Sequence, residues 1–249
     1  MTNPAPIRAD LALVQRGLFE SRNKARAAIE AGLVFANGVA VTKPADPILP
    51  DAVIEAKAPH PWVSRAGMKL EAALTDFGVD PAGKICLDLG ASTGGFTQVL
   101  LSRGAAKVYA VDVGQDQLHH SLRADHRVVS MEATDARALK AKMFDAPPEL
   151  IVCDASFISL RLVLPVPLSL AAPGATLIAL IKPQFEAGRA LVGKGGIVRD
   201  PIVHADVCLD IRGLLGKLGW RVIGLEPSPI AGGDGNREFL IAATAPHSC

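Results

Sequence analysis

The sequence has few aromatic residues and few cysteines. Aromatic side chains make up 4% of its 249 residues, and the four cysteines are Cys86, Cys153, Cys208 and Cys249. They are scattered singly, which is neither the spacing of a zinc site nor the framework of a disulfide-rich secreted domain. We interpret them as small core residues, two of them in strands expected to be buried, apart from Cys249 at the terminus.

Long hydrophobic runs are also missing. No apolar run approaches the roughly 20 residues that a membrane helix needs, and the first residues, MTNPAPIRADLAL, lack the basic and apolar regions of a signal peptide. We therefore expect a cytoplasmic protein with no membrane partner. The net charge of +1 is not that of a general nucleic-acid binder. Any contact with RNA must therefore depend on local clusters of charge.

Hydrophobic residues, in contrast, are abundant at 49%, with 20% charged, which predicts a substantial core that needs neither metals nor disulfides. From residue 84 onward, apolar strands such as KICLDLG, KVYAVDV, ELIVCDAS and ATLIALIKP alternate with helices. This pattern predicts a doubly wound α/β fold, a parallel sheet covered on both faces. The last segment, GWRVIGLEPSPIAGGDGNREFLIAATA, predicts an antiparallel hairpin that closes one edge of the sheet.

The first fifty residues predict a smaller α+β unit. One helix is expected after Asp10 as N-cap, and a second from Ser21 as N-cap to a stop at Gly32. The dipeptide Asn37-Gly38 then predicts a hairpin turn. Five cations against two acids are expected on the exposed side of the helices: Arg8, Arg16, Arg22, Lys24 and Arg26, with Asp10 and Glu20. Charge alone leaves two interpretations open, a patch for phosphate contacts and an ordinary solvated face.

A proline-rich stretch separates the two parts. Prolines recur from position 44 to position 61, as expected of a joint between folding units. We predict a small domain at 1–58, a linker at 59–63 and the α/β domain at 64–249. Ser64 is expected to cap the next helix, which ends at Gly78.

The loop DLGASTGGF, residues 88–96, follows an apolar strand. Gly90 and its partners Gly94 and Gly95 let the backbone approach a ligand closely, and Asp112, 22 residues beyond Gly90, is placed to accept both ribose hydroxyls. Asp135 is the candidate for the adenine edge. These features favour an adenosine cofactor over a plain strand-to-helix turn, the other interpretation of the glycines.

The residues of this loop favour S-adenosylmethionine over NAD. The NAD fingerprint is G-x-G-x-x-G, and here Ser92 stands two positions after Gly90. Asp88, beside the loop, would repel a pyrophosphate and attract the cations of S-adenosylmethionine. A second glycine stretch, GRALVGKG at 188–195, lacks the Ser or Thr of a P-loop, so we interpret it as a loop over the active site with Lys194 near substrate phosphates.

Two reactive residues end apolar strands. Asp154 and Lys182 are expected at the same carboxyl rim as the glycine loop, where a buried ammonium needs a carboxylate partner. A purely structural ion pair is the alternative. Glu238 begins the last strand, and alternation would point either Glu238 or Arg237 toward the site.

Two resemblances extend this interpretation. RADLALVQRGLFESRNKARAAIEAGLVFANGVAV resembles the S4 RNA-binding module, and DLGASTGGF, VCDASF, IKPQFE and NREFL resemble the TlyA family of rRNA methyltransferases, whose catalytic half is similar to the FtsJ methyltransferases. The resemblance implies ribose 2′-O-methylation of cytidines in both ribosomal subunits. One departure is His60-Pro61 in the joint, where related sequences often have an arginine before the tryptophan.

The resemblance also implies roles for residues. A Lys-Asp-Lys-Glu tetrad falls on Lys69, Asp154, Lys182 and Glu238. The implied cofactor residues are Asp88, Gly90, Ser92, Gly94, Gly95, Phe96, Asp112 and Asp135. The S4 resemblance places RNA contacts at Arg8, Arg16, Arg22, Lys24 and Arg26, and Arg65 and Lys194 are further candidates for RNA contacts.

The tetrad suits the reaction, because a ribose 2′-hydroxyl must be aligned and relieved of its proton. Lys182 is assigned the role of base or of hydroxyl-orienting group, Asp154 and Glu238 position the amines, and Lys69 gives electrostatic support; no metal is required. Burial and the neighbouring carboxylates act on Lys182 in opposite directions, and the sequence leaves the net effect open. A monomer is favoured. One alternative is a non-catalytic RNA-binding or assembly factor. Another is a pore-forming haemolysin, which the lack of a membrane-inserting stretch disfavours.

Overall fold

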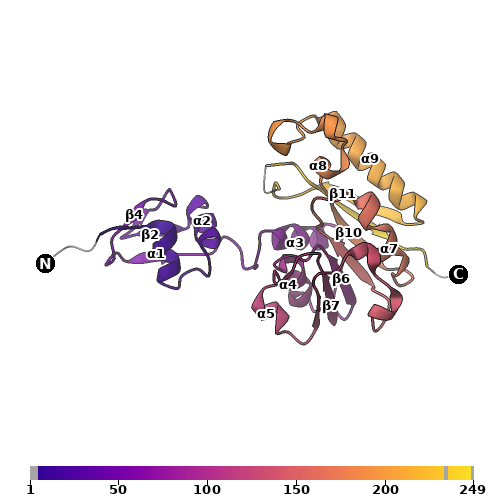
Figure 1. Cartoon of the computed structure of the whole chain (residues 1–249), viewed down its shortest axis with the longest axis horizontal. Helices are drawn as coiled ribbons and strands as arrows, with labels where there is room; N and C mark the ends of the chain where they lie inside the picture. The colour runs from indigo at the N-terminus through magenta and orange to yellow at the C-terminus, as the bar shows by residue number, and fades with distance from the viewer. Residues whose placement is uncertain (1–4, 233–234, 248–249) are drawn as a thin grey trace. The chain divides into compact units, whose positions relative to one another are not determined.

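The computed structural model describes residues 5–232 and 235–247, and the chain divides into two units, Met1–Pro61 and Trp62–Cys249 (Figure 1). Trp62 and Val63, which the sequence suggested as linker, belong to the second unit. The Val63 backbone N–H donates to Gln98 Oε1 at 2.6 Å. Cys249 lies outside the described residues.

The first unit is built from two packed helices and short strands. Ser21 caps its second helix as predicted, since its side chain accepts from the Lys24 backbone N–H. The predicted hairpin is also confirmed, with Asn37 at φ 50° and Gly38 at φ 75° in its turn, as a type I′ turn requires. The elements are β1 (Ile7–Arg8), α1 (Ala9–Gln15), α2 (Arg22–Glu30), β2 (Val34–Ala36), β3 (Val39–Ala40), β4 (Pro47–Ile48) and β5 (Ile54–Ala56). The strand orders are β3-β2-β5 and β1-β4, all antiparallel.

Asp10 is not the N-cap of α1, so that prediction is wrong. Arg8 occupies the cap position without a side-chain cap bond, and Asp10 is fully buried inside the first turn. Its carboxylate accepts from Arg8 Nε at 3.0 Å and from Arg22 Nη2 at 2.8 Å. The two guanidiniums hold the pKa of Asp10 far below its usual range. Asp10 therefore ties α1 to α2 from inside the unit.

The second unit contains a seven-stranded sheet in the order β11-β12-β10-β9-β6-β7-β8. The five strands from β10 to β8 run parallel, while β12 is antiparallel to both β10 and β11, which confirms the predicted doubly wound sheet and its closing hairpin. The strands are β6 (Ile85–Leu89), β7 (Lys107–Val111), β8 (Val128–Met131), β9 (Leu150–Cys153), β10 (Thr176–Ile181), β11 (Arg221–Pro227) and β12 (Phe239–Thr244).

Helices bury both faces of this sheet (Figure 1). One face packs against α3 (Ala66–Asp76), α4 (Gly95–Ser102) and α5 (His120–Arg123), through residues such as Leu70 and Val99. The other packs against α6 (Leu160–Val163), α7 (Pro165–Ser169) and α9 (Pro201–Lys217), through residues such as Leu168 and Ile211. All six residues of β10 are buried, as expected of a central strand covered on both sides.

One prediction for these helices is wrong, and two further features were not predicted. Ser64 does not cap α3, because Arg65 occupies the cap position and no side-chain cap bond forms there. The segment ISLRLVLPVPLSL forms two short helices, since Pro165 begins the second one. Helix α9 was not predicted, although its Asp200 side-chain cap followed by Pro201 is a recognisable start signal.

Candidate active site

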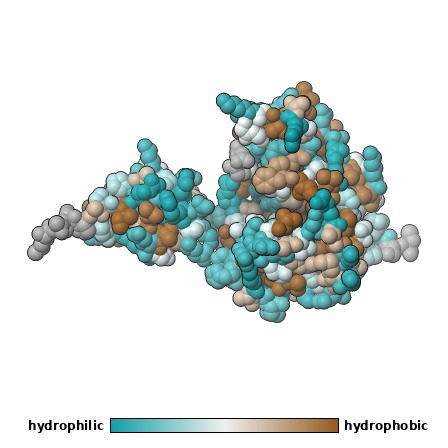
Figure 2. Space-filling view, viewed as in Figure 1, coloured by the Kyte–Doolittle hydropathy of each residue, from teal (hydrophilic) through white to brown (hydrophobic). Residues whose placement is uncertain are grey.

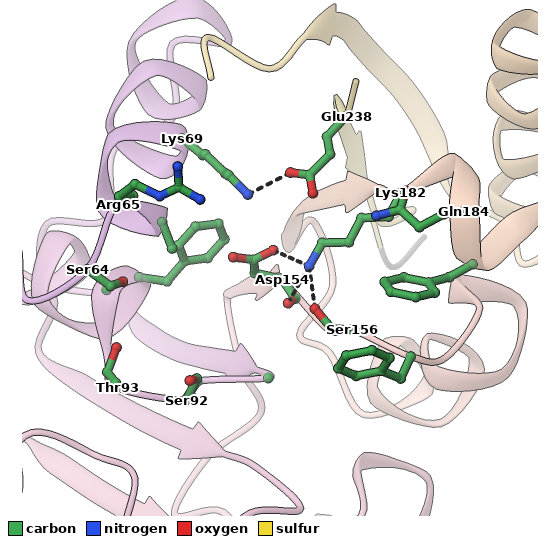
Figure 3. Close-up of a pocket in the computed structure, with 17 residues that line it drawn as sticks. Ser64, Arg65, Lys69, Ser92, Thr93, Asp154, Ser156, Lys182, Gln184 and Glu238 are labelled. Atoms are coloured by element: carbon green, nitrogen blue, oxygen red, sulfur yellow. Dashed lines mark hydrogen bonds and ion pairs between the residues drawn. The ribbon is translucent and has the colours of Figure 1, made fainter. Parts of the chain in front are cut away.

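A pocket of about 370 Å³ lies at the carboxyl ends of β6, β9 and β10 (Figure 3). It is lined by the glycine-rich loop after β6, the segments that follow β9 and β10, and the start of α3. Glu238, which precedes β12, completes the wall. All four residues of the predicted tetrad line this pocket: Lys69, Asp154, Lys182 and Glu238.

Lys69 and Glu238 form a buried ion pair on one side of the pocket. Lys69 Nζ donates to Glu238 Oε2 at 2.6 Å, and their side chains are only 9% and 4% exposed (Figure 3). Arg237, the alternative that strand alternation left open, is exposed. Glu238 is therefore the residue that β12 directs into the site.

Lys182 meets three oxygen atoms on the opposite side. Its Nζ lies 2.7 Å from Asp154 Oδ1 in an ion pair, and it donates to the Asp154 backbone oxygen at 3.0 Å and to Ser156 Oγ at 2.8 Å (Figure 3). The Lys182 and Asp154 side chains are 8% and 14% exposed. The backbone oxygen and the serine hydroxyl accept hydrogen bonds from Lys182, and the contact with the carboxylate is an ion pair.

The glycine loop is packed too tightly for side chains at its key positions. Gly90 has φ 77°, and a Cβ there would lie 2.9 Å from the Cα of Ala155. A Cβ on Gly95 would lie 2.2 Å from Ser64 Oγ, and Gly94, at φ 95°, faces Leu122. The missing side chains therefore let the loop pack closely against its protein neighbours, and Gly90 and Gly95 also line the pocket.

Asp88 lies beneath the loop and does not line the pocket. It is completely buried at the end of β6, and its Oδ2 accepts from Thr97 Oγ1 at 2.7 Å. Its Oδ1 is buried with no hydrogen-bond partner among the described residues. Burial raises the pKa of Asp88 to about 7. A buried, half-satisfied carboxylate of this kind favours a cationic or donor group nearby.

The other two predicted cofactor carboxylates also lie outside the pocket wall. Asp112 follows β7 and accepts from the Ser92 backbone N–H at 2.8 Å and the Gly114 backbone N–H at 2.7 Å. It thereby fixes the glycine loop to the neighbouring strand end. Asp135 is bound by Arg137, whose guanidinium reaches it at 2.6 Å. Ser92 and Phe96 line the pocket.

The second glycine stretch contributes nothing to this pocket. Lys194 is exposed and is not among the lining residues. The backbone oxygen of Gly196 accepts from Asn236 Nδ2, and Val198 N–H donates to Asn236 Oδ1, both at 3.0 Å. A buried asparagine two positions before Glu238 therefore holds the end of this loop.

Several residues around the pocket were not predicted from the sequence. Ser156 contacts Lys182, and Gln184 and Phe185 line the wall after β10. Phe157 is 91% exposed at φ 64°, with its ring centroid 5.2 Å from that of Phe185. Ser156 and Phe157 follow the strand end VCD, and Gln184 and Phe185 follow the strand end LIK. These positions were the signal from which the four residues could have been predicted.

The predicted RNA-binding cations of the first unit are largely engaged within it. Arg8 and Arg22 pair with Asp10, and Lys24 lies 2.6 Å from Glu20 Oε2. Arg16 donates to the backbone oxygens of Leu49, Pro50 and Ala52 at 2.6–2.9 Å. Arg26 is exposed, and together with Ser21, Arg22 and Asn23 it lines a shallow surface depression. Arg16 therefore joins two segments of the unit.

The surface of both units mixes hydrophilic and hydrophobic side chains over the face seen in Figure 2. Within residues 5–232 and 235–247, no helix has the length and apolar character needed to cross a bilayer.

Comparison with known proteins gives two matches to families. Residues 62–245 match the FtsJ-like methyltransferases, and residues 7–54 match the S4 domain. These matches agree with the fold predicted for each part of the chain.

Individual relatives are similar over nearly the whole chain. The 16S/23S rRNA (cytidine-2'-O)-methyltransferase TlyA of Mycobacterium tuberculosis is 44% identical over 94% of this chain and 88% of its own. Hemolysin A of Brachyspira hyodysenteriae is 45% identical over 94% and 98%. A solved structure from Streptococcus thermophilus, whose description proposes a haemolysin, is 41% identical with a TM-score of 0.77 over 99% and 92%. The chain therefore belongs to the FtsJ-like methyltransferase family, and relatives named TlyA and Hemolysin A match it over 94% of its length.

Proposed function

We propose that this protein transfers a methyl group from S-adenosylmethionine to the 2′-hydroxyl of a ribose in ribosomal RNA, with cytidine as the target nucleoside. The observation that carries the proposal is the meeting of two ion pairs, Lys69–Glu238 and Asp154–Lys182, in one pocket that the glycine loop also lines. The relative from M. tuberculosis is named for this reaction on both rRNAs.

The residues present fit S-adenosylmethionine. Gly90 and Gly95 line the pocket with bare backbone, because a Cβ at either would collide with Ala155 or Ser64, and beneath the loop the buried Asp88 Oδ1 lacks a partner among the described residues. Asp112 supports the loop through Ser92 and keeps lone pairs for ribose hydroxyls. Assigning Asp135 to the adenine edge requires it to share its oxygens with Arg137. When bound, S-adenosylmethionine supplies an electrophilic methyl group.

The tetrad is suited to hold the nucleophile. Lys182 is assigned the contact with the 2′-hydroxyl, either as a donor that orients it or, when neutral, as the base that takes its proton. Asp154 fixes Lys182, and Glu238 fixes Lys69, so both amines are held rigidly at the pocket. The Lys69 ammonium lies where it can stabilise negative charge on the oxygen.

RNA binding is assigned to cations in both units. Arg26 and Arg22 line an exposed depression on the first unit, and Arg65 lines the catalytic pocket. Such guanidiniums bind phosphates through their fork of donors. Phe157 and Phe185 at the pocket offer aromatic faces of the kind on which unpaired bases stack.

The proposal is tested in two stages. Calorimetry should show that the purified protein binds S-adenosylmethionine, and methyl-labelled cofactor should then label small subunits, large subunits or free rRNA. Cofactor binding without label on any RNA would contradict the enzymatic function and favour an RNA-binding assembly factor. Absence of cofactor binding would contradict the cofactor assignment itself.

A further inference from the structure

Ser156 contacts Lys182 without belonging to the tetrad. It lies two residues after Asp154, on the segment that leaves β9, and its Oγ accepts from Lys182 Nζ at 2.8 Å (Figure 3). Within the part of the chain that the structure describes, the Ser156 hydroxyl accepts this bond and donates to no protein group. Its own proton is thus available to a ligand.

The three oxygens around Lys182 Nζ differ in how easily a ligand can replace them. One belongs to the Asp154 carboxylate, whose side chain is 14% exposed, and one is the Asp154 backbone oxygen. The third belongs to Ser156, an exposed residue in the pocket wall. A neutral hydroxyl also binds an ammonium less strongly than a carboxylate does. An incoming hydroxyl oxygen can therefore replace Ser156 at the least cost.

The segment that carries Ser156 is fixed from a second side. Glu186, in α8 (Pro183–Glu186), accepts from Ser159 Oγ at 2.5 Å and from the Leu160 backbone N–H at 2.7 Å. The Glu186 side chain is 1% exposed. This contact joins the segment after β9 to the segment after β10, which carries Lys182. The distance between Ser156 and Lys182 is therefore set by the fold.

We propose that Ser156 is a positioning residue, whose hydroxyl holds Lys182 on the pocket side and marks the place where the ribose hydroxyl binds. This inference rests on the proposed function. The incoming 2′-oxygen takes over the Lys182 N–H from Ser156 Oγ, and the released Ser156 hydroxyl remains beside it as a donor. No covalent bond changes in this exchange. The charged groups that surround Lys182 from the other elements of the pocket are Asp154, Lys69, Glu238 and Arg65.

The test compares Ser156→Ala with Ser156→Thr, which keeps the hydroxyl, and with the exposed Ser169→Ala as a matched control. In Ser156→Ala we expect kcat about 10- to 100-fold lower, with KM for rRNA within about twofold of the wild-type value. The acid limb of the kcat/KM profile, which reports the free enzyme, should move to lower pH by about half a unit or more, because without substrate the ammonium has lost the Ser156 acceptor. The two control variants should resemble the wild type.

A second readout needs neither cofactor nor RNA. Labelling of Lys182 by acetic anhydride, followed by peptide mass spectrometry across pH, reports how readily this amine loses its proton. Labelling should reach its midpoint at lower pH in Ser156→Ala than in the wild type. An unchanged midpoint, or a lower kcat without movement of the pH profile, would overturn the inference. A wild-type protein that methylates no RNA would refute the proposed function, while labelling would still decide whether Ser156 acts on Lys182.

Discussion

Lys69 Nζ lies 2.6 Å from Glu238 Oε2, although 169 positions separate the two residues in the chain. Lys69 lies in α3, near the start of the second unit. Glu238 lies directly before β12, near the end of the same unit. The ion pair therefore links the first and last parts of the second unit at the pocket. Since both side chains are buried, each charge depends on the other for its stabilisation.

Breaking this pair should destabilise the second unit. Lys69→Met leaves the Glu238 carboxylate buried without its partner, which should cost about 3 to 5 kcal/mol of unfolding free energy. The double variant Lys69→Met/Glu238→Leu should be more stable than Lys69→Met alone. Urea unfolding followed by tryptophan fluorescence measures this unit, because both tryptophans, Trp62 and Trp220, belong to it. If the loss of unfolding free energy in the double variant equalled the sum of the losses in the two single variants, Lys69 and Glu238 would not interact.

The stability of the protein should depend on pH through Asp88. Because its pKa is raised from 3.8 to about 7 in the folded state, the folded protein keeps a proton that the unfolded chain releases above about pH 4. The unfolding free energy should therefore fall by up to about 4 kcal/mol as pH rises from about 4 to about 7. Above about pH 7 it should become constant.

The variant Asp88→Asn isolates this contribution. Its stability advantage over the wild type should grow between pH 4 and 7, as measured by urea unfolding at a series of pH values. Cys86 and Cys153 nearby do not interfere, because burial raises the pKa of each thiol to about 12. A constant difference between the two proteins across this range would mean that Asp88 is ionised throughout.

Two glycines should respond to alanine in opposite ways. Gly90→Ala places a Cβ 2.9 Å from the Ala155 backbone at φ 77°, so we expect a loss of more than about 1 kcal/mol and weaker binding of S-adenosylmethionine. Gly213→Ala, in α9 with nothing within 4 Å of its Cβ, should gain about 0.5 to 1 kcal/mol. Calorimetry and urea unfolding measure both effects. Unchanged cofactor affinity in Gly90→Ala would contradict the role given to the loop.

The arginines of the first unit should separate into two classes. Arg16→Ala removes donors from three backbone oxygens, so amide hydrogen exchange over residues 7–56 should become faster. Arg26→Ala should leave exchange unchanged and weaken rRNA binding, with a smaller dependence of affinity on salt. If Arg26→Ala bound rRNA as tightly as the wild type, the depression that it lines would not be an RNA contact.

The sequence predicted the sheet well because its inner strands are almost entirely apolar. β6, β9 and β10 carry almost no polar residues before their carboxyl ends, so the polar residues that follow, such as Asp154 and Lys182, stand out as rim positions. The hairpin at Asn37-Gly38 was equally clear, because its turn requires a particular backbone conformation. These signals are local, and local signals are readable from sequence.

Features that depend on tertiary contacts were not predictable in the same way. Asp10 has the character of a capping residue, yet two guanidiniums from different parts of the unit hold it inside the core. Arg237 and Glu238 were indistinguishable until the register of β12 against β10 placed Glu238 at Lys69. The contact between Ser156 and Lys182 likewise requires two strand ends to meet.

The most direct test of the central claim is to map the methyl group that wild type and Lys182→Ala transfer to ribosomal subunits and free rRNA. Nuclease digestion after incubation with methyl-labelled S-adenosylmethionine distinguishes label on ribose from label on base. We expect wild type to label the 2′-oxygen of cytidine, and Lys182→Ala to bind the cofactor with wild-type affinity while losing transfer by about 100-fold or more. Label on a base, or full activity in Lys182→Ala, would contradict the assignment of the tetrad to a ribose hydroxyl.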